Sequence, residues 1–417
     1  MTENKRRVVV TGLGVISPVG NTVSDFWANL TAGKSGVTKL SIVDPEPYTS
    51  KIAGQVLDFD PSKWIDVKEA KRMDRFTQFG YAAAVDAVTD SGLKMENEDP
   101  ANVGVLLGSG IGGMHTFETQ HSALLSRGAR FVSPFFIPML ISDIASGLIS
   151  IKYGACGPNF SVSSACATAS HALGVSLRFI QQGDADVMIT GGAEAGVLPM
   201  GLAGFCSMKA LCTGYNDEPE KGSRPFDAKR CGFVIAEGAG VVVLEELEHA
   251  KARGAKIYGE ILSVGMSADA HHMVAPHPEG LGAEIAMKKA LAQGKISPNQ
   301  IQYINAHGTS THLGDISEVK AVKRLFGEDT NVMLCSTKSM TGHTLGAAGA
   351  IELIATLLAM KTGVVPPTIN QEEPDPECAC NCVPNVAVKA KIDYALSNSF
   401  GFGGHNASVL AARWPEN

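Results

Sequence analysis

One cysteine and two histidines stand at positions in this sequence where they could take part in catalysis. Cys166 lies among small residues in the stretch SSACATA, and His307 and His343 follow much further along the chain. A thiol can accept an acyl group covalently, and an imidazole can hold or donate a proton near neutral pH. The three residue types together indicate a catalytic site in which the cysteine acts as a nucleophile. A metal site is the competing interpretation, although a metal would quench a cysteine that acts as a nucleophile.

The residues around Cys166 predict a turn between a strand and a helix. Residues 158–163 suit a strand, and apolar residues recur at helical spacing from 167 to 182. The free amide groups and positive end of such a helix would stabilise a thiolate. A cysteine packed at a tight turn for structural reasons remains the alternative.

The two histidines also lie at the ends of predicted elements. His307 follows the apolar strand IQYI, and His343 precedes a predicted helix over 347–361. Lys338 precedes His343 by five residues, and Glu352 lies within that apolar helix. A buried carboxylate needs a partner, and Lys338 or a bound cation is the natural candidate. A structural role for either histidine and a surface ion pair for the other two residues stay open.

Alternating strands and helices predict an α/β fold. Apolar runs that end in glycine-rich turns indicate buried strands at 103–113, 186–196, 303–310 and 396–404. Amphipathic helices are predicted at 76–91, 167–182, 281–293, 316–326 and 347–361. Cys166 and His343 each precede a long helix of small residues, which suggests two similar α/β halves that face one another. The loops at 197–235 and 370–385 are predicted to lie on the surface.

Composition narrows the function classes. The chain has 417 residues, of which 45% are hydrophobic, and a formal net charge of −7. These values argue against nucleic acid or an anionic membrane as the main partner. The nine cysteines show no paired framework and suit a reducing compartment, so a cytoplasmic protein is expected. The N-terminal apolar run is interpreted as a strand, and residues 346–360 are too few to span a bilayer.

Two further motifs invite a cofactor interpretation. Residues 108–113 match the pattern GxGxxG, but no acidic residue follows at the spacing that a dinucleotide site requires. A tight turn beside an active site is favoured instead. The stretch CACNC, at 378–382, lacks the second ligand pair of a zinc knuckle and is interpreted as a reduced loop. No cofactor and no metal are therefore predicted.

The motifs in their order resemble the β-ketoacyl-acyl-carrier-protein synthases of fatty acid synthesis, most closely the synthase II type. The resemblance runs from RRVVVTGLGVISPVG through GSGIGG, SSACATA, NAHGTST and STKSMTGH to NSFGFGG, and so covers nearly the whole chain. It implies a thiolase-like fold of two pseudo-repeated halves in a layered α-β-α-β-α core, with the halves at 1–256 and 257–417. It also implies a homodimer and an acyl carrier protein as the partner that delivers acyl and malonyl groups.

The resemblance also assigns roles to residues by position. Cys166 is then the acyl-accepting nucleophile, His307 and His343 handle malonyl decarboxylation, and Lys338 supports them. The remaining implied roles are oxyanion hole and gate for Phe402, with the Cys166 amide; acyl tunnel for Ile111 and Phe205; pantetheine binding for Thr309 and Thr311; support for Glu352 and Asp315; and carrier docking for Lys68, Lys71, Arg72, Arg130 and Lys209. A cation near Asn305, Ala306, Glu352, Ser397 and Asn398 is a family possibility.

Three other functions remain as alternatives. A polyketide ketosynthase shares every catalytic residue with this family. A non-catalytic chain-length subunit lacks the active cysteine, which this chain has. A degradative thiolase requires a second catalytic cysteine near the C-terminal glycine-rich turn, where SFGFGGHN has none.

Overall fold

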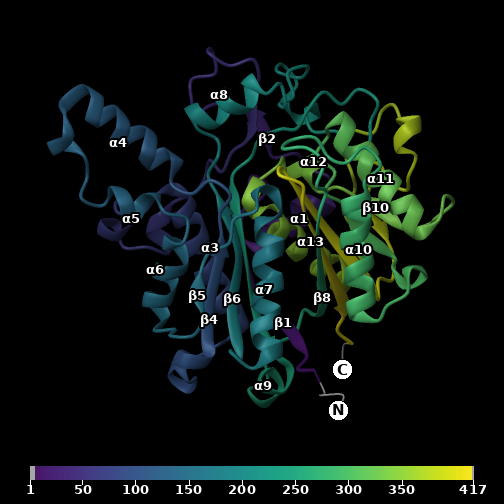
Figure 1. Ribbon diagram of the computed structural model, residues 1–417, viewed down its shortest axis with the longest axis horizontal. Coiled ribbons are helices and arrows are strands. Elements are labelled where there is room, and N and C mark those ends of the chain that lie inside the picture. Colours follow the sequence, from purple (N-terminus) through teal and green to yellow (C-terminus); the bar gives the residue numbers. More distant parts are fainter. Residues whose placement is uncertain (1–4, 416–417) are drawn as a thin grey trace.

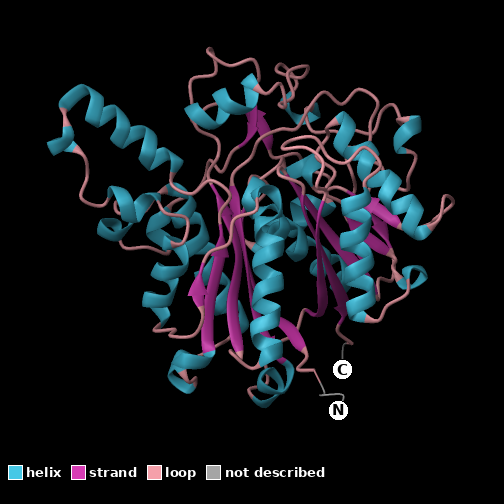
Figure 2. Cartoon of the chain, viewed as in Figure 1, coloured by secondary structure: helices cyan, strands magenta, loops and turns pink. Residues whose placement is uncertain are grey.

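The computed structural model describes residues 5–415, which form one long mixed sheet flanked by helices (Figures 1 and 2). Along the sheet the strand order is β10-β9-β13-β14-β8-β1-β7-β6-β4-β5. These strands are β1 Val8–Ile16, β4 Val103–Gly108, β5 Asn159–Phe160, β6 Val187–Glu194, β7 Gly238–Glu246, β8 Gly259–Ala268, β9 Tyr303–Asn305, β10 Met333–Cys335, β13 Tyr394–Gly401 and β14 His405–Arg413. Two small sheets pair β2 Val37–Lys39 with β3 Ile52–Gly54 and β11 Val364–Val365 with β12 Val388–Lys389.

The long sheet consists of two sets of five strands with the same topology. In the first set the order is β5-β4-β6-β7-β1, and in the second it is β10-β9-β13-β14-β8. In both sets the first three strands are parallel to one another. The fourth strand pairs antiparallel with the third, and the fifth pairs antiparallel with the fourth. Within residues 5–415 the two sets are joined by the pairing of β1 with β8, in which Val9 pairs with Glu260 and Val10 with Gly259. The internal repeat that the sequence suggests is therefore present in the fold.

Helices form three layers around the two sets of strands. The central layer is α7 Thr168–Gln182 with α13 Ala348–Thr362, and both helices contact strands of both sets. The outer layers are α3 Arg75–Ser91 with α6 Ile144–Tyr153 on one side and α10 Leu281–Gly294 with α11 His312–Phe326 on the other. This arrangement confirms the predicted thiolase-like α-β-α-β-α core.

The central helix α13 is apolar because strands of both sets cover it. The segment Leu345–Thr362 is long and apolar enough to cross a membrane by composition alone, but 89% of it is buried inside the protein. It serves here as a core helix. The other helices are α1 Val23–Thr31, α2 Val67–Ala70, α4 Met114–Arg127, α5 Phe136–Leu140, α8 Pro199–Ser207, α9 Leu247–Ala252 and α12 Lys338–Thr341. Figure 1 shows α4 extending away from the layered core.

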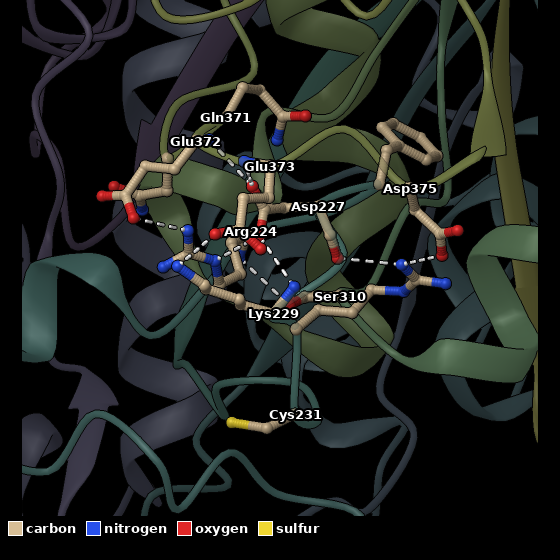
Figure 3. A network of polar contacts seen from close by, with 12 residues as sticks. Arg224, Asp227, Lys229, Cys231, Ser310, Gln371, Glu372, Glu373 and Asp375 are labelled. Carbon is tan, nitrogen blue, oxygen red and sulfur yellow. Dashed lines mark hydrogen bonds and ion pairs between the residues drawn. The ribbon is translucent and has the colours of Figure 1, made fainter. Parts of the chain in front are cut away.

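Two expectations about local structure need correction. The strand predicted over 158–163 is only the two residues of β5, because the following residues turn to present Cys166. The loop over 197–235 does not lie wholly on the surface. Arg224 and Asp227 are fully buried and form an ion pair, and Figure 3 shows them within a polar network that reaches Glu372 and Asp375. Charged residues in a loop suggested exposure, but here they satisfy one another inside the protein.

Candidate active site

A cavity of about 660 Å³ opens at one end of the central helices, and its lining comes from both halves. Cys166, His307 and His343 line it together. All three side chains are buried, and one ligating atom from each lies within 4.8 Å of the others. The structure thus brings together the three residues whose types indicated a catalytic site with a nucleophilic cysteine.

Cys166 is placed by a strained turn at the start of α7. Ala165 has a φ of 51°, a left-handed conformation that costs a residue with a β-carbon about 1–2 kcal/mol. The turn Ala165–Ala167 then leads directly into the helix. In the second half Leu345 has a φ of 50° at the equivalent turn before α13. The same strained turn thus opens both central helices.

Burial favours the protonated form of the Cys166 thiol. Burial raises the pKa of Cys166 to about 12, and the opposing effects of the Lys338 charge and of the Phe402 and Cys166 amides are smaller. The amides at the helix terminus therefore favour the thiolate, as the sequence predicts, but burial has the larger effect on the pKa of Cys166. A proton acceptor is close, because Nε2 of His343 lies 3.0 Å from Sγ.

Both histidines are neutral. Burial, and then the charge of Lys338, lower the pKa of His307 and of His343 well below 6.5. Their rings meet edge to face with centroids 5.4 Å apart. Nδ1 of each ring is buried without a hydrogen-bond partner among residues 5–415. A neutral ring can donate a hydrogen bond to a developing oxyanion without protonating it.

A buried ion pair lies next to the histidines. Lys338 in α12 pairs with Glu352 in α13, and both side chains are nearly inaccessible to solvent. Burial raises the pKa of Glu352 to about 7, although Lys338 acts in the opposite direction. The partner that the sequence required for Glu352 is therefore Lys338.

Two carboxylates that sequence reasoning missed fix the turns of the site. Glu194, at the end of β6, accepts hydrogen bonds from the amides of Gly110 and Ile111 and from the amide of Gly346. Glu318 in α11 accepts from the amides of His307 and Gly308. The turn amides of the GxGxxG match are thus occupied by a carboxylate and are not available to a phosphate. An acidic residue within an otherwise apolar strand was the available signal for Glu194.

Phe402 lies above the cysteine on the turn after β13. Its backbone amide faces the sulfur of Cys166. Gly401 precedes it, and a β-carbon at Gly401 would lie 2.8 Å from the Ser164 oxygen and 3.0 Å from the Cys166 nitrogen. The absence of a side chain at this position keeps the Cys166 amide open to the cavity.

The other predicted cavity residues line the same space. Ile111, Phe205, Thr309 and Thr311 all border it, and the Phe205 ring lies 6.4 Å from the Phe402 ring. The hydroxyl oxygens of the two threonines are 3.0 Å apart. Asp315 does not border the cavity.

Asp315 is instead fully buried behind Arg230, which lines the cavity. It accepts a hydrogen bond from the Phe226 amide and lies 3.3 Å from Nε of Arg230. Burial raises the pKa of Asp315 to about 7. The supporting role that the resemblance gives Asp315 stays a prediction.

The five basic residues expected to dock a carrier do not all gather at the cavity. Lys209 is exposed and borders the cavity. The other four are exposed and do not belong to its lining: Lys68, Lys71, Arg72 and Arg130. The Arg72 guanidinium stacks on Phe135 at 4.6 Å and that of Arg130 on Phe131 at 4.8 Å, so each holds an exposed ring through its cation.

The cation site that the resemblance implies has a suitable set of oxygen atoms. Asn305 Oδ1, Glu352 Oε2 and Ser397 Oγ are buried without hydrogen-bond partners among the described residues. Asn305 and Ser397 face each other in neighbouring strands, and Asn305 donates a hydrogen bond to the Glu352 carbonyl. Oxygen ligands of this kind fit a hard cation.

A buried thiol with two neutral histidines, set between repeated α/β halves, defines a condensing acyltransferase with a thiolase-like fold. The chain belongs to the beta-ketoacyl synthase family. The family model of the N-terminal domain matches residues 5–250, and that of the C-terminal domain matches residues 258–372.

Curated relatives and solved structures of ketosynthases match almost the whole chain. The chain is 50% identical over 409 residues to 3-oxoacyl-[acyl-carrier-protein] synthase 2 of Vibrio harveyi, with 98% of each chain covered. It is 51% identical over 411 residues to the protein of that name in Staphylococcus aureus (strain N315), with 98% of this chain and 99% of the relative covered. Among solved structures, the ishigamide ketosynthase/chain length factor matches with a TM-score of 0.93 and 35% identity over 99% of this chain and 100% of that one. A type II polyketide ketosynthase solved with its acyl-carrier protein matches with a TM-score of 0.91 and 34% identity, at the same coverage.

Proposed function

We propose that this enzyme is a 3-oxoacyl-[acyl-carrier-protein] synthase that elongates fatty acids by two carbons through decarboxylative condensation. The observation that carries the proposal is the contact of 3.0 Å between Cys166 Sγ and His343 Nε2 at a cavity that His307 also lines. The 3-oxoacyl-[acyl-carrier-protein] synthase 2 relatives support it, since they match almost the whole chain.

The first half-reaction transfers the acyl group to Cys166. His343 takes the thiol proton as the sulfur attacks the acyl thioester, and the proton then leaves with the carrier thiol. The thioester oxygen gains negative charge in this step. The backbone amides of Cys166 and Phe402 are the donors that stabilise it.

The second half-reaction forms the new carbon–carbon bond. Malonyl thioester loses carbon dioxide, and His307 and His343 donate hydrogen bonds to the resulting enolate oxygen. The enolate carbon attacks the acyl-cysteine carbonyl, the bond to sulfur breaks, and the departing Cys166 thiolate takes up a proton from solvent. The product is a 3-oxoacyl thioester two carbons longer, and no redox cofactor takes part. A cation held by Asn305, Glu352 and Ser397 would have a structural role beneath this site.

The Gly401→Ala variant tests the oxyanion site. A methyl group at this position would meet the Cys166 amide, so the amide would lose its access to the thioester oxygen. We expect the condensation rate to fall on the order of 10²–10³-fold, as for the loss of one such donor. A steady-state condensation assay measures this. The variant Gly204→Ala is the control, because its β-carbon meets nothing within 4 Å; equal rates in the two variants would contradict the assignment.

The pH dependence of decarboxylation follows from the neutral histidines. The pKa values of His307 and His343 lie well below 6.5, so both rings stay neutral as the pH falls through 6.5 and can still donate a hydrogen bond to the enolate. We therefore expect the acid limb of malonyl decarboxylation to lie below pH 6.5. The rate is measured from about pH 5 to 8, with circular dichroism at each pH to confirm folding. An acid limb at or above pH 6.5 in folded protein would show that a less buried group controls the step.

The acyl carrier protein is the proposed partner. Thr309 and Thr311 offer hydroxyls to the pantetheine arm inside the cavity, and Lys209 offers positive charge beside it. The solved polyketide ketosynthase with its acyl-carrier protein supports this kind of partner. Lys68, Lys71, Arg72 and Arg130 extend the proposed docking face across the neighbouring surface.

The homodimer is proposed from the edge of the sheet and the apolar surface near it. β5 is the last strand of the long sheet, and Phe160 on it is exposed. Ile137, Ile141 and Ile151 nearby are also exposed, with Ile151 at 78%. Apolar surface of this kind beside an open edge strand suits a second copy of the chain. A monomer in sedimentation at micromolar concentration would contradict the proposal.

The division into halves and the location of the enzyme also remain proposals. The matched regions, residues 5–250 and 258–372, lie on either side of the proposed boundary at 256/257 and support it. The cytoplasm is proposed as the location, because the nine cysteines of the sequence show no paired framework and suit a reducing compartment.

Mass spectrometry of the protein mixed with malonyl-carrier protein and a panel of acyl-carrier proteins tests the function. Products two carbons longer than each primer would establish condensation, and the longest primer accepted would give the chain-length preference. Decarboxylation without extension of any fatty acyl primer would favour a polyketide ketosynthase. The polyketide enzymes among the structural matches make that the second candidate.

A further inference from the structure

A pair of cysteines outside the catalytic set lies at the mouth of the cavity. Sγ of Cys212 is 2.9 Å from Sγ of Cys231, and both residues are free thiols. Cys212 is buried and Cys231 is exposed. The proposed reaction uses neither of them.

The two cysteines belong to segments that already run side by side. The Cys212 amide donates a hydrogen bond to the Phe233 carbonyl at 2.9 Å, and the Phe233 amide donates to the Ala210 carbonyl at 3.0 Å. Both segments form the cavity wall, through Lys209 and Ala210 on one and Cys231 to Phe233 on the other. Little main-chain movement is therefore needed to join the two sulfurs.

The surroundings of Cys231 stabilise a thiolate there. The Cys231 sulfur shares a hydrogen bond with the Cys212 sulfur, and the amides of Gly214 and Thr213 also face it. The charge of the buried Arg224 acts in the same direction, and Figure 3 shows Cys231 on the segment beside the network that contains Arg224. These contacts lower the pKa of Cys231, whereas the hydrogen bond to Cys231 and burial raise that of Cys212.

We propose that Cys212 and Cys231 form an oxidation site at the cavity mouth, in which Cys231 reacts with a peroxide and Cys212 resolves the product into a disulfide. The Cys231 thiolate attacks hydrogen peroxide, the O–O bond breaks, and the sulfur becomes a sulfenic acid as hydroxide leaves and takes up a proton to form water. The Cys212 sulfur then attacks, the S–O bond breaks, and a second water leaves. Two electrons pass to the peroxide, and a thiol reductant reverses the change.

The geometry suits this bond. The sulfurs need to approach from 2.9 Å to the disulfide length of about 2.05 Å. The bond would fix the segment of Lys209 to the segment of Phe233, whose ring meets that of His343 at 5.5 Å. The catalytic Cys166 is shielded from the same oxidant, because its buried thiol has a raised pKa.

Peptide mapping after peroxide treatment tests the proposal. The folded protein is treated with hydrogen peroxide, blocked with N-ethylmaleimide and digested with trypsin, which places Cys212 in peptide 210–221 and Cys231 in peptide 231–251. We expect these two peptides to be joined by a disulfide that dithiothreitol cleaves. In the Cys231→Ser variant Cys212 should remain a free thiol, and in Cys212→Ser a sulfenic acid reagent should label Cys231.

The exposed Cys156 provides the internal comparison. We expect Cys231 to be oxidised on the order of 10-fold faster than Cys156, and the Cys156→Ser variant to form the 212–231 disulfide like the parent protein. Oxidation of Cys156 or Cys166 before Cys231, or a Cys231 sulfenic acid that persists while Cys212 stays free, would overturn the proposal. The readout is the covalent state of the thiols, so it does not depend on the reaction that the enzyme catalyses.

Discussion

The Cys166→Ala variant is expected to form no 3-oxoacyl product while it continues to decarboxylate malonyl-carrier protein. Without the sulfur no acyl-enzyme can form, and the loss of a nucleophile lowers turnover on the order of 10⁴-fold or more. The two histidines keep their places, because their positions depend on Glu318 and on the turn before α13 rather than on the sulfur. Mass spectrometry of the thioesters and release of labelled carbon dioxide measure the two activities separately.

The matched control is Cys156→Ala, which removes an exposed thiol outside the cavity lining. We expect this control to condense at the parent rate. Condensation that persists in Cys166→Ala would show that another group accepts the acyl chain. Loss of both activities in a folded variant would show that the sulfur also takes part in decarboxylation. The histidines alone would then not account for that step.

The sequence predicted the repeat and the three reactive residues because their signals are local. A turn of small residues before a long apolar helix occurs at Cys166 and again at His343, and the fold places both turns at the same cavity. The backbone strain at Ala165 and Leu345 could not be predicted. Neither alanine nor leucine favours a positive φ, so these residues give no sign of the turn that they form.

Long-range packing decided the features that the sequence did not reveal. The sequence indicated that the helix terminus stabilises a thiolate at Cys166, but it did not reveal the depth of burial, which both halves set together and which dominates the pKa of Cys166. Glu194 and Glu318 were missed for a related reason. Each accepts hydrogen bonds from backbone amides of a turn on another element, and these contacts form only when the elements pack together.

The two histidines are expected to differ in one measurable way. His307→Ala and His343→Ala should each lower malonyl decarboxylation on the order of 10²–10³-fold, because each removes one donor to the enolate oxygen. Only His343 lies against the sulfur, at 3.0 Å. His343→Ala should therefore also slow transfer of the acyl group to Cys166, whereas His307→Ala should leave that transfer intact.

Intact-protein mass spectrometry after mixing each variant with acyl-carrier protein measures the acylation rate alone, and His115→Ala, an exposed position on α4, is the control. Equal acylation rates in both active-site variants would show that His343 is not the proton acceptor. In that case the Cys166 proton would have to leave by another route, although burial holds the pKa of its thiol near 12 and Lys338 and the two amides only partly offset it. The contrast between the histidines therefore tests whether contact with His343 or the local positive field activates the buried thiol.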